Sequence, residues 1–120
     1  LMVSLNPAFD RLQTGANAWD PESYNNLLSD IDPVRLKLFA TCKEKGVGIS
    51  VMKVFAGGRL LDEKRSPIGI TLTPSQCISY AIDKDGVAVA LTGANTIDEL
   101  NQSLHFLVAK KKTINQDFRK

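Results

Sequence analysis

Two adjacent glycines, Gly57 and Gly58, are the residues of this chain whose type and position point most directly to chemistry. They come directly after the apolar segment 47–54 and directly before Arg59. Because glycine has no Cβ, its backbone adopts positive φ easily and its N–H group can approach a phosphate closely. The arginine adds a positive charge. This turn therefore predicts an anion-binding corner.

A second turn, Gly93–Ala94–Asn95, follows the apolar segment 86–92 and precedes a helix start. The N-terminus of a helix presents free N–H groups and the positive end of the helix dipole, and both favour anions. Either turn alone is more often an ordinary loop. Two such corners after successive strands predict a site for a ligand with linked phosphates.

Three similar blocks of sequence must position these turns. Each block has a short apolar strand followed by a loop and an amphipathic helix. Strands that alternate with helices at this spacing are typical of βαβ units, which form parallel sheets. The blocks cover residues 1–46, 47–83 and 84–109, and a polar tail follows at 110–120.

Three helices have start signals in the sequence. Asp32 followed by Pro33 is typical of an N-cap and a first helical position. The segments TPSQ from Thr73 and TIDE from Thr96 each predict a capping box, in which two side chains satisfy free backbone N–H groups. Helical periodicity predicts a buried face on the first and third of these helices. The face on the first helix consists of Val34, Leu38, Phe39 and Cys42, and the face on the third consists of Ile97, Leu100, Leu104 and Leu107.

Two architectures fit three parallel strands. The strands could form a small open α/β sheet, or they could be consecutive units of a (β/α)8 barrel, which needs about 250 residues. The 120 residues are too few to close a barrel. Three parallel strands also leave two unpaired edges and uncovered apolar surface. We therefore expect an α/β fold that is a partial (β/α)8 TIM barrel and that pairs with the missing barrel half or with itself.

Composition and charge argue against several classes of function. With 43% hydrophobic and 23% charged residues, the chain is typical of one soluble globular domain. A net charge of +2 is too small to indicate nucleic-acid binding. No apolar run reaches the ~18 residues that are needed to cross a bilayer. Cys42 and Cys77 are far apart and have no histidine nearby, which predicts reduced, half-buried thiols. We expect a cytoplasmic protein that binds neither nucleic acid, membrane nor metal.

Four segments of the chain resemble the last three βα units of the aldo-keto reductase family, in the family's order and with family-like spacing. The resemblance covers nearly the whole chain and is closest to the bacterial and archaeal branch that often carries a cysteine-ligated iron–sulfur segment after the barrel. It makes residues 1–120 a single carboxyl-terminal fragment of such a barrel. The four segments are LMVSLNPAFD, DPVRLKLFATCKEKGVGISVMKVFAGGRLL, SPIGITLTPSQCISYAI and GVAVALTGANTIDELNQSL.

The resemblance implies a complete (β/α)8 barrel and reversible hydride transfer, without a metal, between a nicotinamide dinucleotide and a small carbonyl or alcohol. By position, Met52 would cover the nicotinamide ring where many members have an aromatic residue. The loop 53–60 would lie along the pyrophosphate, and the turn 93–95 would receive the phosphate on the adenosine side. The residues implied for cofactor binding are Met52, Lys53, Gly57, Gly58, Arg59, Leu60, Gly93, Ala94, Asn95 and Glu99.

Glu99 departs from the family pattern, because many members have a basic or amide residue there to hold the 2′-phosphate of NADP. A carboxylate would repel that phosphate. As the last residue of the TIDE segment, Glu99 also has a capping role that needs no ligand. The choice between NAD and NADP stays open. Only the resemblance favours NADP, because members of the family commonly use it. Met2 also departs from the family pattern, because it stands where a glutamine commonly holds the carboxamide.

The family's catalytic Asp, Tyr, Lys and His belong to earlier strands, so no residue of this chain inherits a catalytic role. The chain also contains no cysteine cluster for iron. Three functions remain open. The first is the cofactor-binding part of an NAD(P)-dependent oxidoreductase, and the second is a non-catalytic half-barrel that binds a partner or a nucleotide. The third is a small open-sheet domain that binds a nucleotide.

Overall fold

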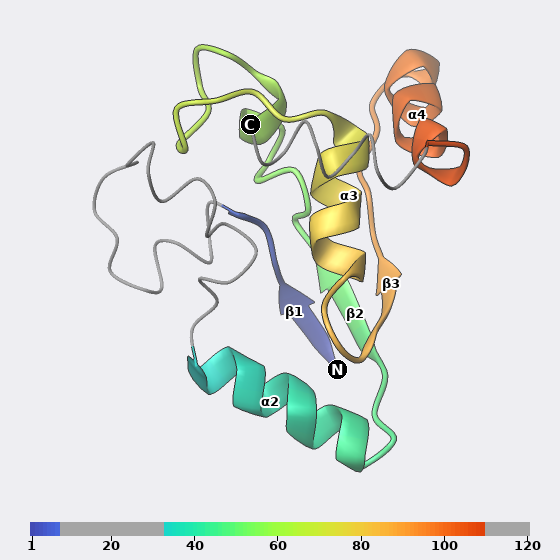
Figure 1. The fold of residues 1–120 in the computed structure, drawn as a ribbon. Helices are drawn as coiled ribbons and strands as arrows, with labels where there is room; N and C mark the ends of the chain where they lie inside the picture. The colour runs from blue at the N-terminus through green and yellow to red at the C-terminus, as the bar shows by residue number, and fades with distance from the viewer. Residues whose placement is uncertain (8–32, 110–120) are drawn as a thin grey trace.

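The chain folds around one parallel β-sheet with helices between its strands. The computed structural model describes residues 1–7 and 33–109. The parallel sheet that the sequence predicts is confirmed, and this sheet is not closed into a barrel. In the order β1-β2-β3, its strands are β1 (Met2–Ser4), β2 (Ile49–Met52) and β3 (Val87–Ala90) (Figure 1).

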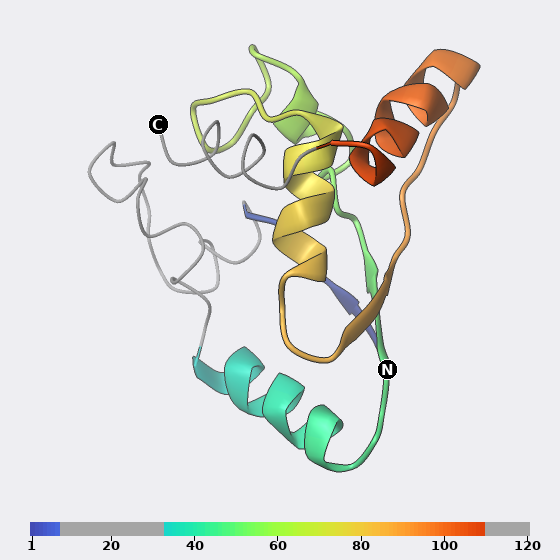
Figure 2. The same cartoon turned by 45° about the vertical axis from the view of Figure 1, so that its right-hand side comes forward.

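The helices alternate with the strands as the three blocks predict. Figures 1 and 2 show α3 against one face of the sheet, with α2 near the end where the strands begin and α4 beyond the end where they finish. The predicted N-cap Asp32 and the tail 110–120 lie outside the described residues. Across the part of the chain that is described, no helix is both long and apolar enough to cross a bilayer. The helical segments are α2 (Pro33–Glu44), η2 (Arg59–Leu61), α3 (Pro74–Ile82), α4 (Ile97–Leu104) and η3 (His105–Leu107), of which η2 and η3 are 3-10 turns.

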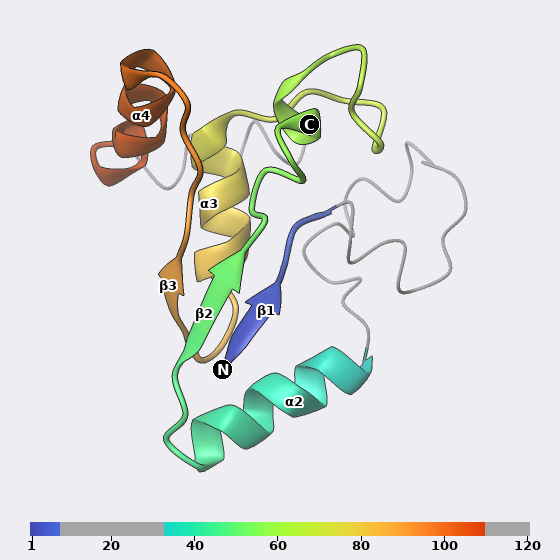
Figure 3. The same cartoon turned by 180° about the vertical axis from the view of Figure 1, so that it is seen from behind.

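The register of the strands sorts their side chains onto two faces. Val3 pairs with Val51, and Met2 pairs with Ser50. Alternate residues of a strand project to opposite faces, so these two pairs lie on opposite sides of the sheet. Val51 is buried on the side of α3, whereas Met2 and Val89, the β3 partner of Ser50, are exposed. In Figure 3 no described helix crosses the face that carries Met2 and Val89, so the described helices cover the sheet on one side only.

The hydrophobic core lies between the sheet and α3. Ile49 and Val51 of β2 pack there with Leu60, Cys77 and Tyr80, and all five side chains are almost completely buried. Burying a large apolar side chain of this kind stabilises a fold by roughly 1.5–3 kcal/mol. The strand β2 therefore anchors the segment that leads into the Gly57–Gly58 turn.

The apolar stripe predicted on the last helix is not buried in the described structure. Ile97 is 79% exposed and Leu107 is 75% exposed, and Ser103 is the buried residue of α4. On α2 the prediction is half correct, because Phe39 is 2% exposed but Val34 is 74% exposed. Helical periodicity shows that a helix has an apolar side, but the neighbouring elements decide whether that side is covered.

The predicted capping box of α3 is present with both of its hydrogen bonds. The Gln76 backbone N–H donates to the Thr73 hydroxyl at 3.2 Å, and the Thr73 backbone N–H donates to the Gln76 side-chain oxygen at 2.7 Å. Pro74 occupies the first helical position, where its missing N–H costs nothing. Local chemistry therefore sets the start of the helix that covers the sheet.

Replacing Thr73 with alanine is expected to lower the free energy of unfolding by about 1 kcal/mol, because an N-cap hydroxyl contributes roughly 0.5–2 kcal/mol. Urea denaturation followed by circular dichroism measures this change. Thr71→Ala is the matched control, since Thr71 is an exposed residue just before the helix. Equal losses in the two variants would contradict the capping role.

Candidate functional site

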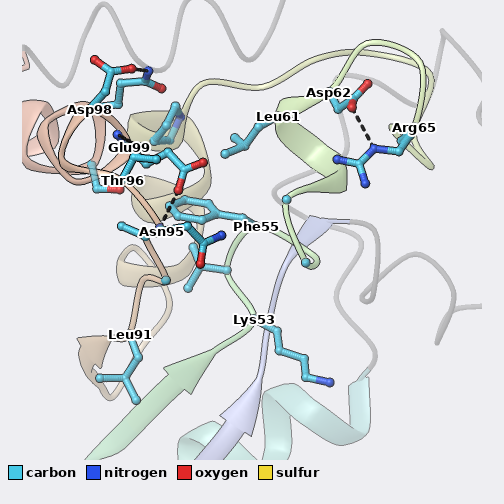
Figure 4. A pocket seen from close by; sticks show the side chains of 18 residues that line it. Lys53, Phe55, Leu61, Asp62, Arg65, Leu91, Asn95, Thr96, Asp98 and Glu99 are labelled. Atoms are coloured by element: carbon cyan, nitrogen blue, oxygen red, sulfur yellow. Dashed lines mark hydrogen bonds and ion pairs between the residues drawn. The ribbon is translucent and has the colours of Figure 1, made fainter.

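A cavity of about 930 Å³ opens at the edge of the sheet where the strands end. Parallel strands all finish at the same edge, and ligands of α/β proteins bind there. Both glycine turns contribute to the wall of this one cavity, Gly57 and Gly58 after β2 and the 93–95 turn after β3. Figure 4 shows side chains from the β2 loop and from the start of α4 on two sides of the space between them.

The loop after β2 has a backbone that only a few residue types adopt without strain. Lys53 and Ala56 have positive φ of 57° and 52°, and Gly57 and Gly58 follow with 68° and 81°. A residue other than glycine in this region costs roughly 1–3 kcal/mol, and such residues cluster at active sites, ligand sites and switch regions. Asn6 holds the loop in place, because its side-chain Nδ2 donates to the Lys53 carbonyl at 2.8 Å.

The glycines leave their backbone open toward the cavity. A Cβ added at Gly57, Gly58 or Gly93 would meet no atom within 4 Å. The cavity therefore reaches the main chain of both turns without an intervening side chain. Backbone groups so placed can approach a ligand's phosphate or sugar closely.

Three of the residues predicted for the site do not line this cavity. Leu60 is 0% exposed and belongs to the core, where its carbonyl accepts a hydrogen bond from the Leu72 N–H at 2.8 Å. Arg59 is exposed outside the cavity wall, and Met52 is half-buried in β2. The neighbouring Leu61 lies in the wall instead. The remaining predicted residues that line the cavity are Lys53, Gly57, Gly58, Gly93, Ala94, Asn95 and Glu99.

The start of α4 forms a different cap from the predicted one. The Thr96 hydroxyl accepts from the Glu99 N–H at 3.1 Å, as expected, but the Glu99 carboxylate accepts from the Asn95 N–H at 2.6 Å. A capping box requires the N-cap residue's own N–H to be the donor, so the reciprocal bond reaches one residue further back. Consequently one backbone N–H expected to face a phosphate is already bonded to a carboxylate.

The charged side chains of the wall are unevenly distributed. Arg65 donates to Asp62 at 2.7 Å, and this bond, with the Lys64 N–H, holds the pKa of the Asp62 carboxyl below its ordinary value. This pair lies apart from Asp98 and Glu99 at the start of α4 (Figure 4). The positive charge of Arg65 is thus balanced locally, and the α4 side of the wall is acidic.

Several residues of the cavity wall are not among those predicted from the sequence. Phe55, Leu61, Asp62, Arg65 and Asp98 line the cavity, and Phe55 lies beside Asn95 in Figure 4. All except Asp98 belong to the segment between β2 and α3. A strand-to-helix loop lies at the carboxyl edge of a parallel sheet, so its position in the sequence was the available signal.

The described structure defines this chain as an α/β protein with a parallel sheet and a cavity at the carboxyl ends of its strands. Comparisons with protein-family models, with curated proteins and with solved structures gave no match. Within residues 1–7 and 33–109, no cluster of three or more His, Cys, Asp or Glu side chains could hold a metal ion.

Proposed function

We propose that this chain is the carboxyl-terminal, cofactor-binding part of an NAD(P)-dependent oxidoreductase of aldo-keto reductase type, acting on a small carbonyl or alcohol. The observation that carries the proposal is that the two glycine turns line one cavity at the carboxyl edge of a parallel sheet. The reaction type comes from the sequence resemblance to that family.

The size and the backbone of the cavity support a dinucleotide as its ligand. Its volume of about 930 Å³ falls in the upper part of the roughly 300–1,000 Å³ range of cofactor sites. Gly57 and Gly58 offer an unobstructed main chain for the linked phosphates, with Lys53 as the cation of the same loop. Gly93 and Ala94 would contact the adenosine side.

The proposal makes the sheet part of a (β/α)8 barrel whose other units belong to the intact protein. Met2 and Val89 are exposed on the face of the sheet that no described helix covers. In a barrel this face points inward and is buried by the other strands, so the exposed apolar side chains support the partial-barrel assignment. A second copy of the chain could cover the same face.

When bound, a reduced nicotinamide supplies the hydride that converts a carbonyl to an alcohol. Residues of this chain orient the dinucleotide, and the proton donor belongs to the earlier barrel units. The open sheet face fits equally the alternative function, a half-barrel module that binds a partner or a nucleotide without catalysis. Binding of a dinucleotide by the intact protein without turnover of any carbonyl would support that alternative.

Replacing Gly58 with alanine is expected to weaken NADH binding by about 1–3 kcal/mol, because the added Cβ keeps a ligand phosphate from its N–H donor. Gly46→Ala is a closely matched control. Gly46 has φ of 66° and open space around it, as Gly58 does, but it lies at the end of α2 and outside the cavity wall. Both variants therefore carry the same backbone strain.

Titration of nicotinamide fluorescence measures the two affinities, and urea denaturation verifies that both variants lose similar stability. The proposal requires a weaker affinity in Gly58→Ala alone. Equal affinities in the two variants, or binding of neither NADH nor NADPH to the unmodified protein, would overturn it.

A further inference from the structure

We infer that the α4 side of the cavity accepts a neutral, hydroxyl-bearing group rather than a phosphate, so the dinucleotide bound here is NAD and not NADP. This inference rests on the proposed function, because it names the form of the cofactor that the same cavity selects. It depends on the residues that α4 contributes to the cavity wall.

Two carboxylates belong to the first turn of α4, and both line the cavity. Glu99 accepts a hydrogen bond from the Asn95 N–H at 2.6 Å, and Asp98 accepts one from the Gln102 side chain at 2.8 Å. Both residues are exposed, so the cavity reaches them. Within residues 1–7 and 33–109, neither of these two carboxylates forms an ion pair.

The balance of charge at this wall is negative. A helix N-terminus contributes the equivalent of about half a positive charge, whereas two ionised carboxylates contribute two full negative charges. The Asn95 N–H, which could have bound an anion, is occupied by Glu99. A phosphate at this wall would have to displace the Glu99 carboxylate and remain close to Asp98.

The basic residues of the cavity lie elsewhere. In Figure 4 the Lys53 side chain extends away from Asn95 and Glu99, and Arg65 faces Asp62 on the far side. A ligand phosphate therefore finds the charge of Lys53 on the side of the β2 loop, because Asp62 already balances Arg65. The carboxylates at the start of α4 suit a hydroxyl donor, and an acidic side chain binds the ribose hydroxyls of NAD in the same way in other dinucleotide sites.

The test compares NADH and NADPH binding, by nicotinamide fluorescence at one fixed ionic strength, in the unmodified protein and two variants. We expect NADH to bind at least about tenfold more tightly than NADPH, because the added phosphate meets two carboxylates that no ion pair of the described residues neutralises. Glu99→Gln should reduce this ratio to about threefold or less, mainly by strengthening NADPH binding. Glu44→Gln removes the same charge at the end of α2, outside the cavity, and should leave the ratio unchanged.

The possible results distinguish the preference for NAD from the proposed function itself. NADPH binding as tight as NADH, or a ratio that Glu99→Gln does not change, overturns this inference and leaves the proposed function standing. Failure of both dinucleotides to bind overturns the proposed function and this inference with it. Urea denaturation of Glu99→Gln, compared with the unmodified protein, verifies that the variant is folded under the conditions of the titration.

Discussion

Replacing Leu60 with alanine is expected to lower the free energy of unfolding by about 2–5 kcal/mol, the usual cost of truncating a fully buried leucine. Leu60 is 0% exposed and lies two positions after Gly58 in the chain. Its carbonyl also ties the loop to Leu72. The Leu60 side chain therefore anchors the loop of the candidate site in the hydrophobic core. The sequence resemblance instead implies that Leu60 contacts the cofactor.

Leu61→Ala is the matched control, because Leu61 is the adjacent leucine but is partly exposed and lines the cavity. We expect it to cost less than half as much stability, since less apolar surface is lost. Urea denaturation of both variants measures the difference. A small loss in Leu60→Ala, or a larger one in Leu61→Ala, would contradict the assignment of Leu60 to the core.

The buried thiol of Cys77 is expected to make the protein less stable as the solution becomes alkaline. Its side chain is 0% exposed, and burial raises the pKa of the thiol from its ordinary value of 9.0 to about 12. Both Cys77 and Cys42 are buried, deeper than the half-buried thiols that the sequence predicts. Because the thiolate is the reactive form, Cys77 is a packing residue rather than a nucleophile.

The direction of the effect follows from proton binding. Above pH 9 the unfolded chain loses the Cys77 proton, whereas the folded chain keeps it up to about pH 12. The contribution of this thiol to stability is therefore complete below pH 9 and disappears as the pH rises to about 12. Over that window the loss amounts to about 4 kcal/mol.

Urea denaturation at about pH 8 and about pH 10.5 measures roughly half of this loss, about 2 kcal/mol. Other groups also titrate in this range, so the same experiment on Cys77→Ala provides the baseline. The unmodified protein should lose about 2 kcal/mol more than the variant between the two pH values. Parallel losses would mean that the Cys77 thiolate is solvated in the folded protein.

Features that depend on neighbouring residues in the sequence were predictable. The capping box at Thr73 was predictable because its partners lie three residues apart, and both of its hydrogen bonds are present. The parallel order of the strands was predictable from their alternation with helices. The burial of Ile49 and Val51 is consistent with the apolar character of their strand.

Features that depend on contacts between distant elements were not predictable. Ile97 and Phe39 both belong to apolar helical stripes, yet one is exposed and the other buried, because the surrounding elements differ. The positive φ of Lys53 and Ala56 has no signal in residue type. Asn6 helps to maintain that backbone, and it lies 47 positions away from Lys53 in the chain.

The sequence by itself determined the helix starts, the parallel strands and the two glycine turns at the strand ends, because each depends on short-range hydrogen bonding or on the twofold and 3.6-fold repeats of the backbone. Only the tertiary structure decided that both turns line one cavity, that Leu60 faces the core, and that Glu99 occupies the Asn95 N–H. These outcomes depend on how strands, loops and helices meet in space, and local residue pattern does not specify that arrangement.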